Sequence, residues 1–523
     1  MRVVVIGAGL GGLSAACHLA GAGHEVVVLE RDRRPGGRAG LVERGGYRID
    51  NGPVVLTMAG ILAGVFAAAG ASMDDHLKLR RLDPMYRACF AAGGDPFGGG
   101  VLRVRPGREA MTEEIAQTCG PADAAAYGRF CDWLGRLYRV EMAHFIDRNY
   151  DSPLDLLRPP GPLLALARLG GLRRLSGVVD DHFGDPRLRK LFSFQALYAG
   201  LSPLQALALY GVITYMDTVE GVWFPDGGIH AVAVGLAEAA ARAGAELCYG
   251  AEVEAIRRRR GTGGAVTGVA LAGGEVVPAE VVVANPDLPA VYRQLLPDLS
   301  PPWQARRGRY SPSCVVWLAG GPMEVGTEVA HHNLHFAQEW EGAFTELLEG
   351  GTRMTDPSLL VTVPTVTDPT LAPPGRHCLY VLEPVPNLDG RVDWGAERER
   401  ARADLARRVA GFGYLGPVGA GALEVEELTD PVDWGRQGLE RGTPFSLSHR
   451  FFQSGPFRPD NVDARVPGLV LVGSGTRPGV GVPMVLLSGR LAAERVRQWA
   501  GGSWTRPGRR VRGRNPRGTG RRR

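Results

Sequence analysis

Three glycines and one acid near the N-terminus have the types and the spacing of a dinucleotide-binding turn. Gly7, Gly9 and Gly12 follow the apolar run 3–6, and Glu30 ends the next apolar run, eighteen residues after Gly12. Gly7 permits a tight bend, Gly9 lets the backbone approach a pyrophosphate, and Gly12 lets the following helix close onto the strand. Glu30 is placed to accept hydrogen bonds from both ribose hydroxyls of an adenosine. The pattern predicts a strand at 3–6, a helix at 13–22 whose N-terminus faces phosphate, and a strand at 26–29.

A glycine pair and an arginine follow soon after Glu30. Gly36, Gly37 and Arg38 lie in a loop that an NAD-binding domain does not need at this point. Glycines allow the chain to run beside a bound cofactor, and a guanidinium can donate two hydrogen bonds to phosphate oxygens. An ordinary turn before a strand is the alternative. The loop favours a flavin over a nicotinamide dinucleotide.

A matching half lies near the other end of the chain. The apolar run 469–472 enters the glycine-rich segment 473–483, and a helix is predicted from Met484 to Trp499. The N-terminus of this helix would offer backbone donors to the pyrimidine edge of a flavin ring, where negative charge collects on reduction. Both ends of the chain are therefore predicted to hold one cofactor.

Seven motifs spread over residues 1–500 carry a family resemblance. They are residues 5–9 together with Glu30, then 35–39, 50–53, 83–86, 221–228, 449–459 and 473–483. With these motifs the chain resembles the bacterial carotenoid desaturases of phytoene desaturase type, within the FAD-containing amine oxidase superfamily. The resemblance implies FAD as cofactor and phytoene, or a closely related linear carotene, as a substrate desaturated in steps toward lycopene-like products.

The implied fold is α/β, a Rossmann-type FAD-binding domain with a discontinuous α+β substrate domain and a helical cap. We expect FAD-binding segments at 1–84, 222–295 and 460–500, a helical substrate- or membrane-facing region at 85–221, and a substrate sheet at 296–459. In this family the backbone near Val253 pairs with adenine. The residues expected to contact FAD are Gly7, Gly9, Gly11, Gly12, Glu30, Arg31, Gly37, Arg38, Val253, Gly473, Gly475, Gly481, Val482, Pro483 and Met484.

The chemistry of desaturation needs few polar groups. A flavin accepts a hydride from a saturated carbon while a proton leaves its neighbour, so the protein must mainly orient the chain and exclude water. Asp155, with Arg148 nearby, lies in a region that the family places over the flavin, and its carboxylate is a candidate to take the proton. The alternative is a helix-start acid after Pro153. His331 and His335 could form part of a metal site if they lay on one helical face. No acidic or cysteine residue lies near them at ligand spacing, so no metal is expected.

Composition agrees with a large flavoenzyme. The 523 residues, 45% of them apolar, are enough for two domains, and the seven cysteines show no paired spacing, which favours reduced thiols in the cytoplasm. Residues 1–2 lead directly into the first strand, so no signal peptide is expected. The tail, 501–523, holds nine arginines and no acid. The tail is predicted to be disordered. It is either an arm that binds anionic lipid headgroups or a tolerated terminal extension, and nucleic-acid binding is not expected.

Two uncharged runs, 51–73 and 191–216, are long enough to span a bilayer. Because each contains proline, glycine and polar residues, both are interpreted as buried helices, the second able to line a hydrocarbon tunnel or dip into one leaflet. We therefore expect peripheral attachment to the inner face of the cell membrane.

Several other functions share this fold. A later-step desaturase, a carotenoid ketolase and an isomerase stay open, whereas the intact N-terminal motif argues against a prenyl-protein escort that has lost FAD. Residues 473–475 lack the aspartate common after the first glycine in amine oxidases. One dinucleotide motif makes oxygen or a quinone a better electron acceptor than a nicotinamide.

Overall fold

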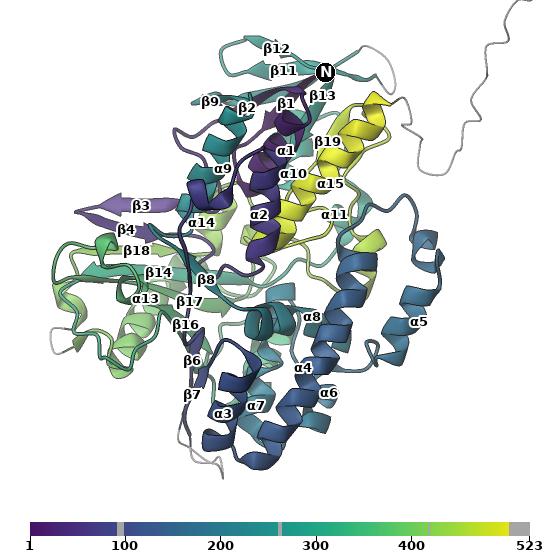
Figure 1. Ribbon diagram of the computed structural model, residues 1–523. Helices are drawn as coiled ribbons and strands as arrows, with labels where there is room; N and C mark the ends of the chain where they lie inside the picture. Colours follow the sequence, from purple (N-terminus) through teal and green to yellow (C-terminus); the bar gives the residue numbers. More distant parts are fainter. Residues whose placement is uncertain (92–98, 260–263, 417–418, 502–523) are drawn as a thin grey trace, which may run out of the picture.

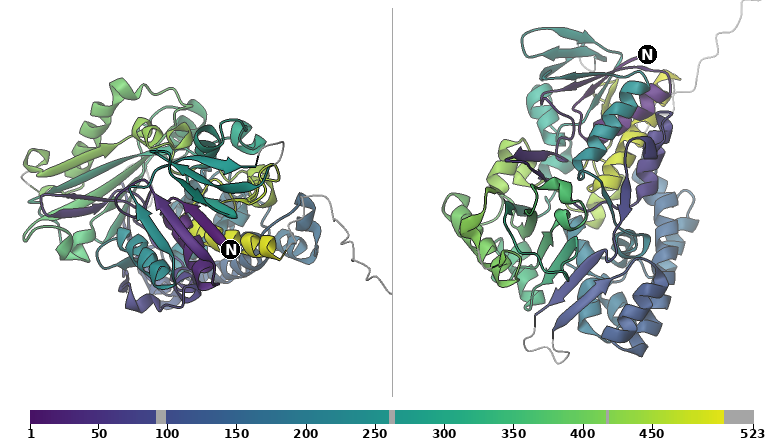
Figure 2. Two further views of the ribbon diagram at one scale, coloured as in Figure 1. Left: turned by 90° about the horizontal axis from the view of Figure 1, so that it is seen from above. Right: turned by 60° about the vertical axis from the view of Figure 1, so that its left-hand side comes forward.

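The protein is described by a computed structural model that covers residues 1–91, 99–259, 264–416 and 419–501 (Figure 1). The cofactor-type motifs of both chain ends lie in one half of the molecule. A second sheet and a group of helices form the other half, side by side in the right-hand view of Figure 2. Apart from Gly501, the predicted disordered tail lies outside the described residues.

A five-stranded parallel sheet carries the N-terminal motif. Its order, β19-β13-β1-β2-β9, brings strands from both ends of the chain together. Val3 and Val5 of β1 pack on one layer, Val4 and Ile6 pack on the other, and all four are buried. Burial on both faces explains why these strands are continuous apolar runs rather than alternating ones. The strands are β1 (Arg2–Ile6), β2 (Glu25–Glu30), β9 (Glu246–Tyr249), β13 (Val281–Ala284) and β19 (Leu469–Leu471).

Helices cover one face of this sheet and a small antiparallel sheet covers the other. The first and last helices, α1 and α15, lie side by side (Figure 1). The predicted strands 3–6 and 26–29 and the helices near both termini are confirmed. The helices are α1 (Leu10–Gly21), α2 (Ala59–Ala68), α9 (His230–Arg242) and α15 (Val482–Ala500), and the small sheet consists of β10 (Val253–Arg258), β11 (Val266–Leu271) and β12 (Val276–Pro278).

A seven-stranded sheet forms the second half, in the order β18-β14-β17-β16-β15-β6-β7. One face packs on helix α13, and the other faces the helical region. Its strands are β6 (Tyr86–Phe90), β7 (Gly100–Val104), β14 (Ser313–Gly321), β15 (His332–Phe336), β16 (Leu359–Thr362), β17 (His377–Val385) and β18 (Val425–Thr429). Around it lie α12 (Trp340–Thr345), η8 (Glu346–Gly350), η9 (Pro364–Val366), η10 (Pro369–Leu371), α13 (Trp394–Gly411) and α14 (Pro431–Arg436). Three further short elements lie elsewhere: α11 (Trp303–Arg307) packs with the small-sheet side of the five-stranded sheet, and η14 (Phe451–Gln453) and η15 (Gly455–Phe457) contact each other.

The helical region is centred on the long helix α4, whose buried aromatic side chains stack with those of neighbouring helices. Two short pairings, β3-β4 and β5-β8, are separate from the large sheets. The region contains α3 (Arg108–Thr118), α4 (Pro121–Glu141), η2 (Met142–Ile146), η3 (Pro153–Leu157), α5 (Gly161–Arg168), α6 (Leu175–His182), α7 (Pro186–Leu191), η4 (Phe194–Ala199), η5 (Ala208–Tyr210), α8 (Gly211–Thr214) and η6 (Tyr215–Glu220). The short pairings are β3 (Leu41–Arg44) with β4 (Tyr47–Asp50) and β5 (Leu79–Arg81) with β8 (Trp223–Pro225).

The structure corrects two predictions. Strands β6 and β7 belong to the seven-stranded sheet although they lie in the segment 85–221 that is predicted to be helical, and β6 pairs in parallel with β15. The runs 51–73 and 191–216 do not form single helices, because glycine and proline divide each into short elements. Among the described residues no helix combines the length and the apolar character needed to cross a bilayer.

Candidate active site

A cavity of about 1050 Å³ connects the two halves of the molecule. At one end it is lined by the glycine turn after β1 and by Glu30. It continues past the turn after β19 to the first residues of α15, and then passes between the seven-stranded sheet and the helical region. The carboxyl ends of the parallel strands and the N-termini of two helices therefore open into one space, which is where α/β folds bind their ligands.

Two helix N-termini at the cavity are chemically alike. Helix α1 follows Gly9 and α15 follows Gly481, and neither helix has a side-chain cap or an acid in its first turn. Their backbone N–H groups are therefore available to an anionic ligand, and the helix dipoles favour one. Gly481 has a φ of +109°, a conformation that a side chain would strain.

The glycines of the N-terminal turn have different roles. At Gly12 a Cβ atom would overlap the carbonyl oxygen of Gly7, so this glycine lets α1 close onto β1, as predicted. At Gly9 and Gly11 a Cβ would instead contact the side chain of Asn285, 2.7 Å and 2.9 Å away. Gly9 and Gly11 line the cavity and Gly12 does not.

Glu30 is buried at the nucleotide end of the cavity and is 6% exposed. Its Oε2 atom accepts a hydrogen bond from the backbone N–H of Ala8 at 2.6 Å, and its Oε1 atom accepts one from that of Asp32 at 2.9 Å. Burial raises the pKa of this carboxyl, and the two N–H groups oppose the shift. An ionised carboxylate has further lone pairs, so Glu30 can still accept hydroxyl groups of a ligand.

Arg38 lines the cavity, but most of its donors are already used within the protein. Its Nη1 atom donates to the hydroxyl of Ser474 at 2.6 Å and to the carbonyl of Pro444 at 2.9 Å, and its Nη2 atom lies 3.3 Å from Asp287. The predicted two-point phosphate contact would compete with these bonds. Arg38 instead ties the loop after β2 to the turn after β19.

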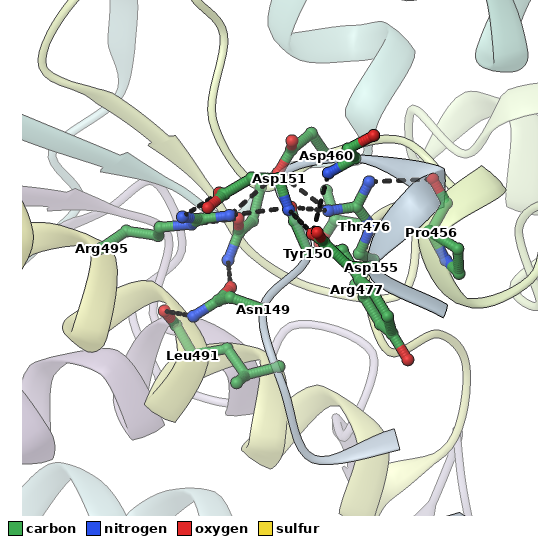
Figure 3. A network of polar contacts seen from close by, with 12 residues as sticks. Asn149, Tyr150, Asp151, Asp155, Pro456, Asp460, Thr476, Arg477, Leu491 and Arg495 are labelled. Atoms are coloured by element: carbon green, nitrogen blue, oxygen red, sulfur yellow. Dashed lines mark hydrogen bonds and ion pairs between the residues drawn. The ribbon is translucent and has the colours of Figure 1, made fainter. Parts of the chain in front are cut away.

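Two buried arginines shape the C-terminal turn. Arg458 is fully buried and donates to the backbone carbonyls of Ser474 and Thr476 at 2.6 Å and 2.9 Å. Arg477 donates to the carbonyl of Tyr150, so the same turn is fixed to the helical region (Figure 3). Gly475 does not line the cavity, because its position packs against Leu288; this differs from the FAD contact predicted for it.

The remaining residues predicted to contact FAD lie along the same cavity. They come from the turn after β1, the loop after β2, the start of β10, the turn after β19 and the first turn of α15. They are Gly7, Arg31, Gly37, Val253, Gly473, Val482, Pro483 and Met484.

The structure does not support a catalytic position for Asp155. Its Oδ2 atom accepts the backbone N–H groups of Asp151 and Ser152 at 2.8 Å and 3.0 Å, and with Ser152 it forms a capping box at the start of η3. Asp155 is not among the residues that line the cavity. Arg148 does line the cavity, with its guanidinium over the ring of Tyr150. The helix-start alternative is thus the geometry observed.

The part of the cavity beyond α15 is apolar. Side chains on the face of the seven-stranded sheet opposite α13 form one wall, and side chains of η2, η4, α8 and η6 form the other. These side chains are Phe145, Ile146, Phe194, Leu197, Val212, Ile213, Met216, Leu334, Phe336, Leu360 and Leu382. Such a wall excludes water and offers contact to an extended hydrocarbon.

Two buried acids that sequence reasoning missed also line this cavity. Asp217 accepts hydrogen bonds from the hydroxyl of Tyr86 and from Gln195, at 3.3 Å for the latter, and burial raises its pKa to about 6. Glu141 is 5% exposed, and its Oε1 atom has no hydrogen-bond partner. The sequence holds a signal for Glu141, because it is four residues after Leu137 on the apolar face of α4.

The histidines considered as metal ligands lie on and beside strand β15. His332 contacts Thr362 at 2.9 Å, His331 contacts Thr367 at 2.7 Å, and His335 contacts a tyrosine hydroxyl. Among the described residues no group of three or more potential ligands is suited to hold a metal ion. His331 and His335 belong to an extended segment rather than to one helical face.

The chain has clear relatives. Residues 10–497 match the protein family of flavin containing amine oxidoreductases. A phytoene dehydrogenase from Streptomyces griseus is 49% identical over 498 residues, which are 95% of each chain. A zeta-carotene-forming phytoene desaturase from Myxococcus xanthus is 38% identical over 505 residues, covering 95% of this chain and 94% of that one.

The fold is also found among solved structures. An oxidoreductase from Methanosarcina mazei superposes with a TM-score of 0.59 at 18% identity, over 94% of this chain and 100% of that chain. At this level of identity the similarity shows a common fold alone.

Proposed function

Because the chain belongs to the family of flavin containing amine oxidoreductases, we propose that this FAD-dependent enzyme desaturates a linear carotene and that phytoene is its first substrate. The two curated relatives described above bear names of phytoene-desaturating enzymes.

The observation that carries this proposal is the continuity of the cavity. The residues that would hold FAD are Glu30 at the ribose, the first turn of α1 at the pyrophosphate, the backbone near Val253 at the adenine, and the first turn of α15 at the ring. They share one space with the apolar walls. FAD, when bound, supplies an acceptor for a hydride. The apolar walls would hold the carotene extended beside the ring and exclude water.

The direct test supplies phytoene in liposomes to the purified protein with FAD and either oxygen or a quinone. We expect visible absorption bands of conjugated polyenes to grow, with products separated by chromatography. Protein stripped of FAD is the control. No new absorption from phytoene would contradict the proposal, and conversion of only an already coloured carotene would assign a later desaturation step.

We also propose that the enzyme attaches peripherally to an anionic membrane surface through an exposed apolar edge. This apolar edge consists of Leu154, Leu157, Leu164, Phe451 and Phe452, which are 38–74% exposed. Elements η3 and η15 are in contact, and Phe457 of η15 packs with both exposed phenylalanines, so the edge is formed by neighbouring segments.

Charge and location support this attachment. Residues 156–179 include four arginines and no acid, and two of these, Arg158 and Arg168, are exposed on either side of Leu164. Ser454, between η14 and η15, and Gly455, the first residue of η15, line the cavity. A lipid-soluble substrate would therefore have a short path from the bilayer to the site. Apolar side chains ringed by cations are typical of interfacial binding.

Flotation with liposomes tests the attachment. The double variant L154D/L157D should lose binding to vesicles that contain anionic lipid, while folding and bound FAD stay unchanged. Val276→Asp is the matched control, because Val276 is 52% exposed on β12, at the top of Figure 1 and away from α5 at the right. Equal flotation of both variants and the unchanged protein would rule out this surface.

A further inference from the structure

We propose that Glu141 is the residue that accepts the proton released as each new double bond forms. The inference rests on the proposed function and identifies a catalytic group for it. It gives this role to a residue of α4 in place of Asp155.

Glu141 has the environment of a functional acid. It is the last residue of α4, it lines the cavity, and its Oε1 atom is buried without a hydrogen-bond partner. A buried carboxyl without a partner costs stability, since burial of an ionisable group is unfavourable unless it is paired. Such a group is more readily explained by a task in the cavity than by support of the fold.

Contacts of its neighbours place Glu141 near the first turn of α15. The next residue, Met142, packs in a cluster that includes Met484 of that turn. Tyr210, which interacts electrostatically with Glu141, donates its hydroxyl to the carbonyl of His449. The Nε2 atom of His449 in turn accepts the backbone N–H of Val480, two residues before α15. The carboxyl is therefore at the end of the cavity where the flavin ring would bind.

The other acids lining the cavity are already engaged or distant from this end. Glu30 and Asp217 accept the hydrogen bonds described above, and Asp287 is paired with Arg38. Asp32 and Glu252 lie at the nucleotide end, next to Glu30 and Val253 in the sequence. Among the described residues that line the cavity, Glu141 is thus the carboxyl without a hydrogen bond near the ring end.

The step balances in atoms and electrons. FAD, held by the residues named above, would be the two-electron oxidant: as one C–H bond of the substrate breaks, FAD would accept that hydrogen with its electron pair as a hydride. The C–H bond on the adjacent carbon breaks, its electron pair forms the new π bond, and its proton passes to a carboxylate oxygen of Glu141. The carbon pair is oxidised by two electrons, and the proton is later released to solvent.

Several titratable groups surround Glu141. Tyr210 faces it from η5, and Arg148 lines the cavity from the segment after η2. Tyr138 is one turn earlier on α4 and interacts with Glu220 of η6, which packs on α4. Burial raises the pKa of Glu141 well above the usual range for a glutamate, and within the described part of the chain no charged group offsets that burial. The ionised, proton-accepting fraction therefore increases as pH rises.

Kinetics of the holoenzyme test the role. In anaerobic stopped flow with phytoene in liposomes, Glu141→Gln should slow flavin reduction by about 10²–10⁴-fold, the usual contribution of a general base. Glu141→Asp should recover part of the rate. Glu220→Gln is the matched control, because Glu220 is a half-buried glutamate with an unpartnered oxygen and a raised pKa, yet it does not line the cavity.

A spectroscopic measurement gives a readout that does not depend on turnover. The infrared band of a protonated carboxyl should shift when a fully conjugated carotene binds to the holoenzyme, and Glu141→Gln, but not Glu220→Gln, should abolish that shift. The rate should rise with pH in the unchanged enzyme and lose this dependence in Glu141→Gln. Equal rates for the two glutamine variants would overturn the inference, whereas an unchanged enzyme that cannot oxidise phytoene would overturn the proposed function itself.

Discussion

Replacement of Glu30 by glutamine tests the nucleotide end of the site quantitatively. A hydrogen bond to a charged acceptor contributes about 1.5–3 kcal/mol, and one between neutral groups about 0.5–1.5 kcal/mol. If both ribose hydroxyls bind Glu30, removal of its charge costs about 1 kcal/mol for each. The total of about 2 kcal/mol corresponds to a roughly 30-fold weaker affinity for FAD.

The same substitution affects the protein without FAD. The Oε2 atom of Glu30 accepts the N–H of Ala8 and the Oε1 atom accepts that of Asp32, but glutamine offers only one acceptor oxygen. One backbone donor is left without a partner, which costs about 1–3 kcal/mol of folding free energy.

Equilibrium titration of FAD fluorescence measures the affinity, and denaturant unfolding measures the stability. Glu25→Gln is the matched control, since Glu25 begins the same strand but is exposed. A dissociation constant for FAD within about threefold of the unchanged protein, in a folded E30Q variant, would refute the assignment of Glu30 to the ribose.

Three further substitutions have outcomes that follow from particular contacts. Gly12→Ala should yield protein that purifies without flavin, seen in the visible spectrum, because its Cβ would overlap the carbonyl of Gly7 and push α1 from β1; a normal flavin content would show that α1 can shift without loss of the site. Asp155→Ala should lower unfolding free energy by about 0.5–2 kcal/mol through loss of the cap, with turnover per bound FAD unchanged; a large drop in turnover would restore its catalytic assignment. Arg353→Met should lower the free energy of unfolding by about 3–5 kcal/mol, because it leaves the fully buried Glu383 without its cation. Thermal unfolding measures this loss, and a melting temperature equal to that of the unchanged protein would contradict a stabilising role of the ion pair.

The sequence predicted best where one local pattern determines one local structure. The apolar runs 3–6, before Gly7, and 26–29, before Glu30, were predicted as buried strands and form β1 and β2. These elements pack against both layers of one sheet, so burial fixes their character wherever the rest of the chain lies.

The predictions were wrong where the local structure depends on contacts with distant parts of the chain. Nothing local in the segment around Tyr86 indicates that β6 would pair with β15, nearly 250 residues later. Likewise, the bonds of Arg38 to Ser474 and Asp287 depend on chain segments that meet only in the folded state. For Glu141 the sequence does contain a local signal, because its spacing places it on the apolar face of α4. An acid at such a position is uncommon, so burial was not expected for it.

The order of strands in the five-stranded sheet has a consequence for biosynthesis. Strand β19 belongs to the same sheet as β1, which begins at Arg2, and helix α15 packs directly on α1. While the ribosome is still adding the last segment, α1 lacks the neighbour that covers its buried face. Stable capture of the coenzyme must therefore wait until α15 has emerged, so nascent chains halted before residue 482 should be colourless and dependent on chaperones.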